Sequence, residues 1–563
     1  MIYHCEDHTC NYWDEGEKLP ERCPQCGRKL LRANETDMTG DDWTALGNTL
    51  WDAEASDKKR MVDCFRKAAY LGSAWGVCNL GICMEQGNGV EADPVQAFWL
   101  YQQAVEMGSL NAVCCLGVCY QYGIGTAPDA EKAAELYCKA AEYGSPRGQM
   151  LLARAFHDGI GVEADAAEAV HWVRAAAYQR YGEGMYRLGV CYEYGDGVEQ
   201  NWEHAVHWFR EAAESGVSTA MTDLGYCYEK GCGVEQSWEQ AFSWYRRGAE
   251  CGYPVSMSNL GLCYKRGYGV EQNWQEAAKW YEQGAQCGHL QSMDNLAYCY
   301  EYGEGVEQNE DRALYWYRRG AEAGSDYCMY CLGWNYSNGE GVEQNMTEAI
   351  RWYTAAAEGG NADAMHDLGW HYDHGEGVEQ DMKKAICWYE RAAEQNHPAA
   401  MNSLGECYAM GRGVPRDLET AMEWYRRAAE LGEAMADYNM GWHLEQAGKL
   451  SEAYAHYRKA ADGNDDSAWW ALGRFYENGV VVAQDGKEAR RCYETGEKLG
   501  SVKCKMRLAR CKLLGIGGRR AKKAGLDLCR QALELAKESS EKEDYGYEAE
   551  MNLLRRTIAE NES

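Results

Sequence analysis

Residues 364–394 read AMHDLGWHYDHGEGVEQDMKKAICWYERAAE, and this stretch decides the fold. Ala364, Leu368 and Tyr372 recur at a spacing of four, which places them on one face of a helix. The segment 375–378, Gly-Glu-Gly-Val, interrupts that helix, because glycine adopts the positive φ that a tight turn needs. The first half therefore predicts one helix, called helix A here, followed by a sharp turn.

The second half predicts another helix, called helix B. Asp381 is suited to cap its N-terminus, and Ala385, Trp388 and Tyr389 follow at helical spacing. We expect Gly369, in helix A, to let the backbone of another segment come close. Neither helix can bury its apolar stripe alone, so the pattern predicts hairpins that stack on one another.

The Leu-Gly pair of this stretch recurs along the chain, with Leu-Ala as a variant and Met-Gly at Met440, and its first residue is called the register residue below. It stands at Leu80, Leu116, Leu152, Leu188, Leu224, Leu260, Leu296, Leu332, Leu368, Leu404 and Met440, which makes ten successive intervals of 36. Three further residues extend the series: Leu46 lies 34 residues before Leu80, Leu472 lies 32 after Met440, and Leu508 lies 36 after Leu472. Fourteen repeat units are therefore expected, and such self-similarity is the signature of a solenoid.

The pattern A-x-x-x-L-G-x-x-Y-x-x-G-x-G-V, followed by A-x-x-W-Y-x-x-A-A, resembles the Sel1-like repeat, a relative of the tetratricopeptide repeat. It is kept in phase at Leu224…Tyr245 and Leu260…Tyr281. The resemblance implies an all-α, right-handed superhelical solenoid with helix A on its concave side, and an interaction scaffold or adaptor. Its expected extent is 41–540, after an N-terminal segment 1–32 and a linker 33–40, with a capping helix at 541–563. The first unit lacks the Gly-x-Gly turn, and the Met440 unit is closer to a plain tetratricopeptide repeat.

Four cysteines, Cys5, Cys10, Cys23 and Cys26, precede the repeats. Cys23-Pro-Gln-Cys26-Gly is a zinc-knuckle motif, and four thiolates suit one tetrahedral Zn²⁺. The segment resembles a rubredoxin-type zinc ribbon, with a structural ion that such a short domain needs in order to fold. His8 is the alternative to Cys10 as a ligand, and iron is the alternative metal. Besides a structural role, a docking role for the ribbon stays open.

The net charge of −31 argues against duplex nucleic acid as the main partner and favours a basic protein partner. The N-terminus has no apolar secretory stretch and no window is long enough to span a membrane, so we expect a cytoplasmic chain with reduced thiols. The Gly-x-Gly-Val turns lack the lysine of a phosphate-binding loop, and no nucleophile motif is present. An enzyme is therefore not expected.

Two sets of residues look chemically active but are interpreted as packing. The cysteines three after the register residue are expected to be small, buried and unlinked, because neighbouring helices lie too far apart for disulfides; they are Cys83, Cys119, Cys191, Cys227, Cys263, Cys299 and Cys407. Asp367, His371 and His374 share a helix face that resembles a metal site, yet His371 stands in the same cysteine position. We interpret it as a polar variant of that position.

Candidate partner contacts come from three positions of helix A that related repeats expose to their groove. Two residues before the register residue lie Tyr186, Asp294, Tyr330, His366, Asn402 and Tyr438. Two residues after it lie Tyr226, Tyr298, Trp334, Trp370 and Trp442. Five residues after it lie Glu193, Glu229, Glu301, Asp373, Glu445 and Glu477.

These residues predict an aromatic and acidic groove for a basic segment of a partner protein. Packing between neighbouring A helices is the alternative role for any one aromatic residue. Two other functions stay open: a nucleic-acid-associated factor that uses the zinc ribbon and the basic segment 503–530, and a binder of small molecules or cell-wall fragments.

Overall fold

The computed structural model describes residues 2–5, 13–15, 30–33, 38–51, 55–542 and 548–562. It divides into two compact units, Met1–Ser292 and Met293–Ser563, called unit 1 and unit 2 here. Each unit is described by itself.

Unit 1 begins with three short strands, β1 (Ile2–Cys5), β2 (Trp13–Glu15) and β3 (Leu30–Ala33). They form an antiparallel sheet in the order β2-β1-β3, with Tyr3 opposite both Asp14 and Arg32. The predicted zinc ligands Cys10, Cys23 and Cys26, and the alternative His8, lie outside the described residues. Only the backbone of Cys5, at the end of β1, is described.

All other regular structure in the described residues is helical. Unit 1 continues with α1 (Gly40–Thr49), α2 (Ala55–Tyr70), α3 (Ala74–Gln86), α4 (Pro94–Glu106), α5 (Leu110–Tyr122), α6 (Ala130–Glu142), α7 (Pro146–Asp158), α8 (Ala166–Tyr178), α9 (Gly182–Tyr194), α10 (Trp202–Glu214), α11 (Ser218–Lys230), α12 (Trp238–Glu250), α13 (Pro254–Arg266) and α14 (Trp274–Gln286).

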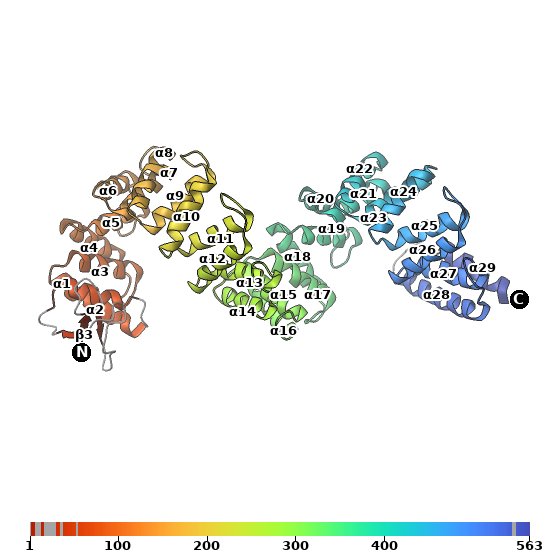
Figure 1. Cartoon of the computed structure of the whole chain (residues 1–563), viewed down its shortest axis with the longest axis horizontal. Helices are drawn as coiled ribbons and strands as arrows, with labels where there is room; N and C mark the ends of the chain where they lie inside the picture. Colours follow the sequence, from red (N-terminus) through yellow and green to blue (C-terminus); the bar gives the residue numbers. More distant parts are fainter. Residues whose placement is uncertain are drawn as a thin grey trace. The chain divides into compact units, whose positions relative to one another are not determined.

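Unit 2 contains α15 (Leu290–Tyr302), which starts at the end of unit 1, and α16 (Glu310–Glu322), α17 (Asp326–Asn338), α18 (Met346–Gly359), α19 (Ala362–His374), α20 (Met382–Glu394), α21 (Pro398–Met410), α22 (Leu418–Glu430), α23 (Ala434–Gln446), α24 (Leu450–Asp462), α25 (Asp466–Asn478), α26 (Gly486–Lys498), α27 (Val502–Leu514), α28 (Lys522–Lys542) and α29 (Glu548–Glu562). Odd-numbered helices up to α27 are A helices, and the even-numbered helix that follows each is its B helix. Within each unit, successive hairpins lie side by side (Figure 1). The predicted stacked helical hairpins are confirmed.

The glycine after the register residue lets an aromatic ring of helix B come close. A Cβ on Gly225 would lie 2.6 Å from the ring of Tyr245, and one on Gly369 would lie 2.7 Å from the ring of Tyr389. Both tyrosines belong to helix B of the same hairpin and are almost completely buried. A Cβ on Gly369 would also lie 3.2 Å from the backbone oxygen of Ala385 in helix B, so the expected close backbone is present, although the ring of Tyr389 is nearer.

The Gly-x-Gly turn joins helix A to helix B and also contacts the previous hairpin. Gly159 ends α7 in the left-handed conformation, with φ of 69°. Gly161, two residues later, lies against the first turn of α6, where a Cβ would overlap the carbonyl group of Ala130. The second glycine of the turn therefore lets two hairpins stack at their ends.

The turn is closed by side chains as well. Gln236 donates from Nε2 to the carbonyl oxygen of Glu229, at 2.8 Å, and the same bond recurs in other hairpins. Asp381 accepts hydrogen bonds from the backbone of Lys383 and Lys384, so its predicted capping role is confirmed. Hydrogen bonds within the hairpin therefore stabilise the turn between helix A and helix B.

The cysteines three after the register residue are free thiols and, except for the half-buried Cys191, they are buried. The predicted unlinked packing is confirmed. His371, which replaces such a cysteine, is buried and its Nδ1 lies 3.0 Å from the carbonyl oxygen of Glu376. Burial lowers its pKa. No group of three or more metal-ligating side chains occurs in the described residues.

Candidate functional site

The A helices of neighbouring hairpins are joined by polar side chains. The residue two before the register residue contacts the residue one before it in the next repeat, 37 positions later. Tyr330 donates to Asp367 over 3.2 Å, His366 lies 3.5 Å from the Ser403 hydroxyl, and the Asn439 side chain donates to Asn402 over 3.0 Å. We call these contacts the A-helix seam. Its members are half-buried or buried and hold neighbouring repeats in register.

Three residues predicted to face an open groove are buried, so that expectation was wrong for them. Asp294 accepts hydrogen bonds from Ser325, at 2.7 Å, and from the Cys328 thiol. Asn402 lies in the seam, and Asp373 pairs with Arg412 at 2.9 Å. In each case the polar group finds a partner on the next hairpin, which removes it from solvent.

Four of the six carboxylates five after the register residue serve the core, namely Glu229, Glu301, Glu445 and Glu477. The buried tyrosine of helix B donates its hydroxyl to the acid 16 residues before it: Tyr245 to Glu229 at 2.8 Å, Tyr493 to Glu477 at 2.8 Å, and Tyr317 to Glu301. In the shorter Met440 repeat, Tyr457 donates to Glu445 at 2.7 Å. A buried hydroxyl needs such an acceptor. Sequence reasoning missed this role, although the constant spacing of acid and tyrosine is a signal that could have revealed it.

The aromatic residues two after the register residue are the most accessible of the predicted set. Tyr226 and Trp334 are each 45% exposed and Trp442 is 40% exposed. Tyr298 and Trp370 are half-buried, with their rings 4.6 Å from Tyr302 and 4.3 Å from His374. Exposed rings of this kind are available as anchors for a partner.

The remaining predicted aromatic residues are half-buried beside the tyrosine or phenylalanine of helix B. Tyr186 lies 5.9 Å from Phe209, and Tyr438 lies 5.6 Å from Tyr457. Burial raises the pKa of Tyr438 to about 12. His366 stacks on His397 at 5.1 Å. These rings are therefore only partly accessible to a partner, and they pack mainly against neighbouring side chains.

Unit 1 contains a patch in which predicted residues meet an acid that was not predicted. Burial, followed by the nearby carboxylate of Asp223 on α11, raises the pKa of Tyr186 on α9. Burial raises the pKa of Asp223, and burial followed by the charge of Asp223 raises the pKa of Glu193. Neither carboxylate has an ion-pair partner within the described part of the chain. Together with the exposed Tyr226, these residues are called the α9–α11 patch.

Asp367, His366 and Ser403 in unit 2 show the bonding order of a hydrolase triad. His366 Nδ1 lies 3.1 Å from Asp367, and its Nε2 lies 3.5 Å from the Ser403 hydroxyl. Ser403, however, stands in the interior of α21, where the backbone amides donate within the helix. Such amides cannot stabilise an oxyanion. The arrangement is a polar link between A helices and gives no support for an enzyme.

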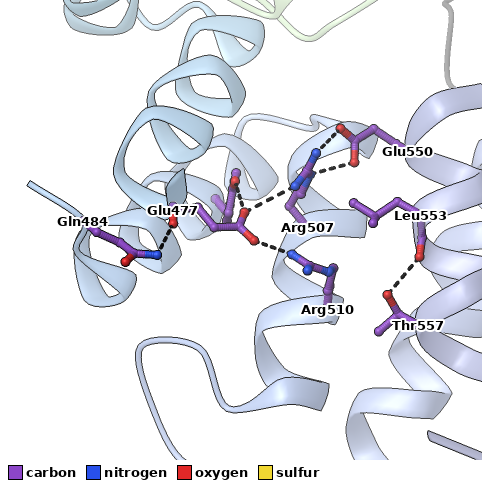
Figure 2. A network of polar contacts seen from close by, with 8 residues as sticks. Glu477, Gln484, Arg507, Arg510, Glu550, Leu553 and Thr557 are labelled. Atoms are coloured by element: carbon purple, nitrogen blue, oxygen red, sulfur yellow. Dashed lines mark hydrogen bonds and ion pairs between the residues drawn. The ribbon is translucent and has the colours of Figure 1, made fainter. Parts of the chain in front are cut away.

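Several arginines of the basic segment 503–530 have partners within the fold, and Figure 2 shows Arg507 and Arg510 among carboxylates. Arg507 donates to both oxygens of Glu550, at 2.6 and 2.7 Å, and to Glu477 at 3.3 Å. Arg510 also donates to Glu477. Arg520 donates to the carbonyl oxygen of Leu513 and to Asn561. Three of the cations counted as a nucleic-acid contact therefore have partners inside the fold.

The comparisons with known proteins agree with this architecture. The Sel1 repeat model matches twelve segments: residues 76–109, 112–145, 146–181, 182–217, 218–253, 254–289, 290–325, 326–361, 362–397, 398–433, 434–465 and 468–501. The chain belongs to the Sel1 repeat family. No curated protein matches it at a significant level.

Two solved structures are similar to this Sel1 repeat protein. One is c5321, described as a protective antigen of uropathogenic Escherichia coli strains, at 29% identity and a TM-score of 0.58, over 76% of this chain and 94% of that one. The other is a Sel1 repeat protein from Oxalobacter formigenes, at 28% identity and a TM-score of 0.44, over 56% of this chain and 93% of that one. Repeats of the Sel1 kind commonly mediate protein–protein interaction and are typically scaffolds without enzymatic activity. Within the described residues, no helix combines the length and the apolar character that crossing a bilayer requires.

Proposed function

We propose that this Sel1 repeat protein is a scaffold that binds a basic, aromatic-bearing segment of a partner protein on its A helices. The observation that carries the proposal is the α9–α11 patch of unit 1. There, two half-buried carboxylates, Glu193 and Asp223, lie beside exposed tyrosine rings and lack an ion pair within the described residues. A lysine or arginine from a partner would supply the missing charge.

The chemistry of the patch favours a cation that brings its own apolar stem. Tyr226 and Tyr194 are exposed, and their rings suit the methylene chain or guanidinium plane of a basic side chain. Because burial raises the pKa of both carboxyl groups, a bound cation would stabilise their ionised forms. The net charge of −31 adds long-range attraction for such a partner. In unit 2, the exposed Trp334 and Trp442 offer further anchors of the same kind.

The double variant Glu193→Gln with Asp223→Asn is expected to weaken binding of a labelled lysine- and phenylalanine-bearing peptide by about thirtyfold. Each lost charge removes on the order of 1 kcal/mol of attraction in a partly screened site. Fluorescence anisotropy at low and high salt measures the effect, and the wild-type affinity should fall as salt rises. The matched control is Glu199→Gln with Glu235→Gln, two exposed carboxylates on the turns of the same repeats. Equal affinity for the two double variants would remove the patch from the binding surface.

The raised pKa values also fix the sign of the pH dependence. As pH falls through the window between the raised pKa values and ordinary carboxyl values, Glu193 and Asp223 take up protons in the folded chain first. Peptide binding is therefore lost in that window, while these two groups make folding more favourable. The measurement is a pH titration of peptide binding. We expect the control variant to lose affinity in this window and the Glu193→Gln, Asp223→Asn variant to show no further loss. That difference would assign the pH dependence of binding to these two carboxyl groups.

For the N-terminal segment we propose one structural Zn²⁺ held by Cys5, Cys10, Cys23 and Cys26. What supports it is the donor set, since four thiolates match zinc in number and softness. Elemental analysis of the purified chain should give one zinc per chain, and Cys23→Ser with Cys26→Ser should abolish it. Exposed repeat cysteines serve as the control, and Cys251→Ser with Cys287→Ser should retain the metal. Stoichiometric iron, or zinc retained by the first variant, would contradict the assignment.

We also propose that the chain works in a reducing cytoplasm.

A further inference from the structure

Four side chains of unit 2 form a row across consecutive A helices. They stand two residues after the register residue and follow one another at intervals of 36: Trp334 on α17, Trp370 on α19, Glu406 on α21 and Trp442 on α23. We call them the α17–α23 row. The rings of Trp334 and Trp442 are exposed, while Trp370 and Glu406 are half-buried. The row therefore presents three flat apolar groups and one carboxylate, one for each repeat.

The A-helix seam shows that these four helices are direct neighbours. It joins α17 to α19 through Tyr330 and Asp367, at 3.2 Å, and it joins α21 to α23 through Asn439, which donates to Glu406 over 3.2 Å. The seam contact between α19 and α21 completes the series. Neighbouring helices pack on the order of 8–10 Å apart. The members of the row therefore recur at about that spacing.

Glu406 gives the row a negative charge that the fold balances only in part. Arg412, which follows α21, pairs with Asp373 at 2.9 Å and lies 3.7 Å from Glu406. Because one guanidinium serves two carboxylates, one negative charge remains among these three groups. Asp373 is buried, whereas 34% of the Glu406 side chain is exposed. A cation from a partner can therefore reach Glu406.

The spacing of the row selects the conformation of a bound segment. A polyproline II helix has three residues per turn and rises 3.1 Å per residue, so every third side chain returns to the same face after about 9.3 Å. A β-strand returns to the same face after about 6.6 Å and again after about 13 Å, and both distances miss the row. An α-helix returns after seven residues, about 10.5 Å, but its apolar stripe is broad, and the seam beside the row is polar. The polyproline II conformation therefore matches the row best.

We propose that the α17–α23 row binds a proline-rich segment of a partner protein in the polyproline II conformation. Every third residue of the segment faces one A helix, with proline rings on the three tryptophans and a lysine or arginine at Glu406. Aromatic surfaces suit such segments, because their conformation is largely preformed and loses little entropy on binding. The inference rests on the proposed function, in which A helices bind a partner segment, and it adds a second class of segment for unit 2.

The first test measures fluorescence anisotropy with the full chain and labelled 13-residue peptides of proline that carry one central arginine. With the arginine in the centre, prolines flank it whichever way the peptide lies. In one variant peptide, glycine replaces the prolines at positions 4 and 10, which face the row, and in the other it replaces those at positions 5 and 9, which do not. Both lose two prolines, so any difference reports contact with the row. The first variant peptide should bind about tenfold more weakly than the second.

The second test changes the protein. Trp334→Ala should weaken binding of the parent arginine peptide by about tenfold. Its matched control is Tyr315→Ala, which removes a ring that is 53% exposed on α16, outside the row, and should leave the affinity unchanged. Glu406→Lys should abolish binding of the arginine peptide and restore binding of a peptide with glutamate in the centre. Because the rescue is a gain of binding, it cannot be explained by misfolding.

Equal affinities for the two glycine peptides would overturn the proposal, as would equal effects of Trp334→Ala and Tyr315→Ala. Glu406→Lys without rescue by the glutamate peptide would overturn the position given to the cation. The lysine- and phenylalanine-bearing peptide provides a separate measurement, because Glu193→Gln with Asp223→Asn alters the α9–α11 patch alone. Failure of the proline-rich segment is therefore distinguishable from failure of the proposed function.

Discussion

Replacing Gly161 by alanine should separate two hairpins of unit 1 and cost more than about 4 kcal/mol. The backbone of Gly161 has φ of 69°, which costs an L-residue about 1–2 kcal/mol. The larger part comes from contact with the previous hairpin. A Cβ would overlap the carbonyl group of Ala130 and lie 2.8 Å from the amide nitrogen of Glu131. Because these atoms are backbone within the first turn of α6, no side-chain rotation can relieve the overlap.

Gly144 provides the control, since it also has positive φ, of 81°, but no atom lies within 4 Å of a Cβ built there. Gly144→Ala should therefore cost only the conformational part, about 1 kcal/mol. Hydrogen exchange should show faster exchange in α6 and α7 of the Gly161 variant, because a solenoid opens locally where one interface is weakened. Equal destabilisation by the two substitutions would mean that Gly161 matters only for its backbone conformation.

This glycine also marks how far the sequence predicts the fold. A positive φ was expected at the turn from composition alone, because Gly-x-Gly recurs where helix A must end. The contact with Ala130 was not visible, since it joins residues of different repeats and depends on how hairpins stack. For the same reason the ring that lies nearest to the glycine after the register residue, such as that of Tyr245, was not predicted. The periodicity of the sequence predicts the helices and turns, whereas the role of each small residue depends on how the hairpins pack against one another.

The candidate groove was predictable in outline but not residue by residue. Position along helix A identified Tyr226, Trp334 and Trp442 as accessible rings. It failed for Asp294 and Asp373, because their hydrogen-bond partners belong to the next hairpin and bury them. A charge pattern read from one helix cannot show which acids are already paired. Of the acids that stay available, Glu193 was predicted from its position on helix A, whereas Asp223 emerged only when the A helices were placed side by side.

A paired acid also underlies the second substitution with a large expected effect, Arg507→Ala in α27 (Figure 2). Arg507 donates two hydrogen bonds from α27 to the carboxylate of Glu550, which is buried on α29, and it also donates to Glu477. Removing it leaves a buried carboxylate without its cation, which costs about 3–5 kcal/mol, far more than the pair gains over an apolar contact.

The loss should therefore appear first as release of α29, before the rest of unit 2 unfolds. Limited proteolysis is expected to cut the Arg507→Ala chain within α29 and to leave α25 and α26 intact, since Glu477 still accepts from Arg510 and Tyr493. Arg491→Ala is the control, because its pair with Glu488 is exposed and should contribute less than about 0.5 kcal/mol. If both variants resist protease equally, α29 is held by its apolar contacts, Met551 and Leu554 among them, and the arginine merely satisfies Glu550. If only Arg507→Ala is cut, then Arg507, which belongs to the basic segment that the sequence offered as a nucleic-acid contact, holds α29 in place.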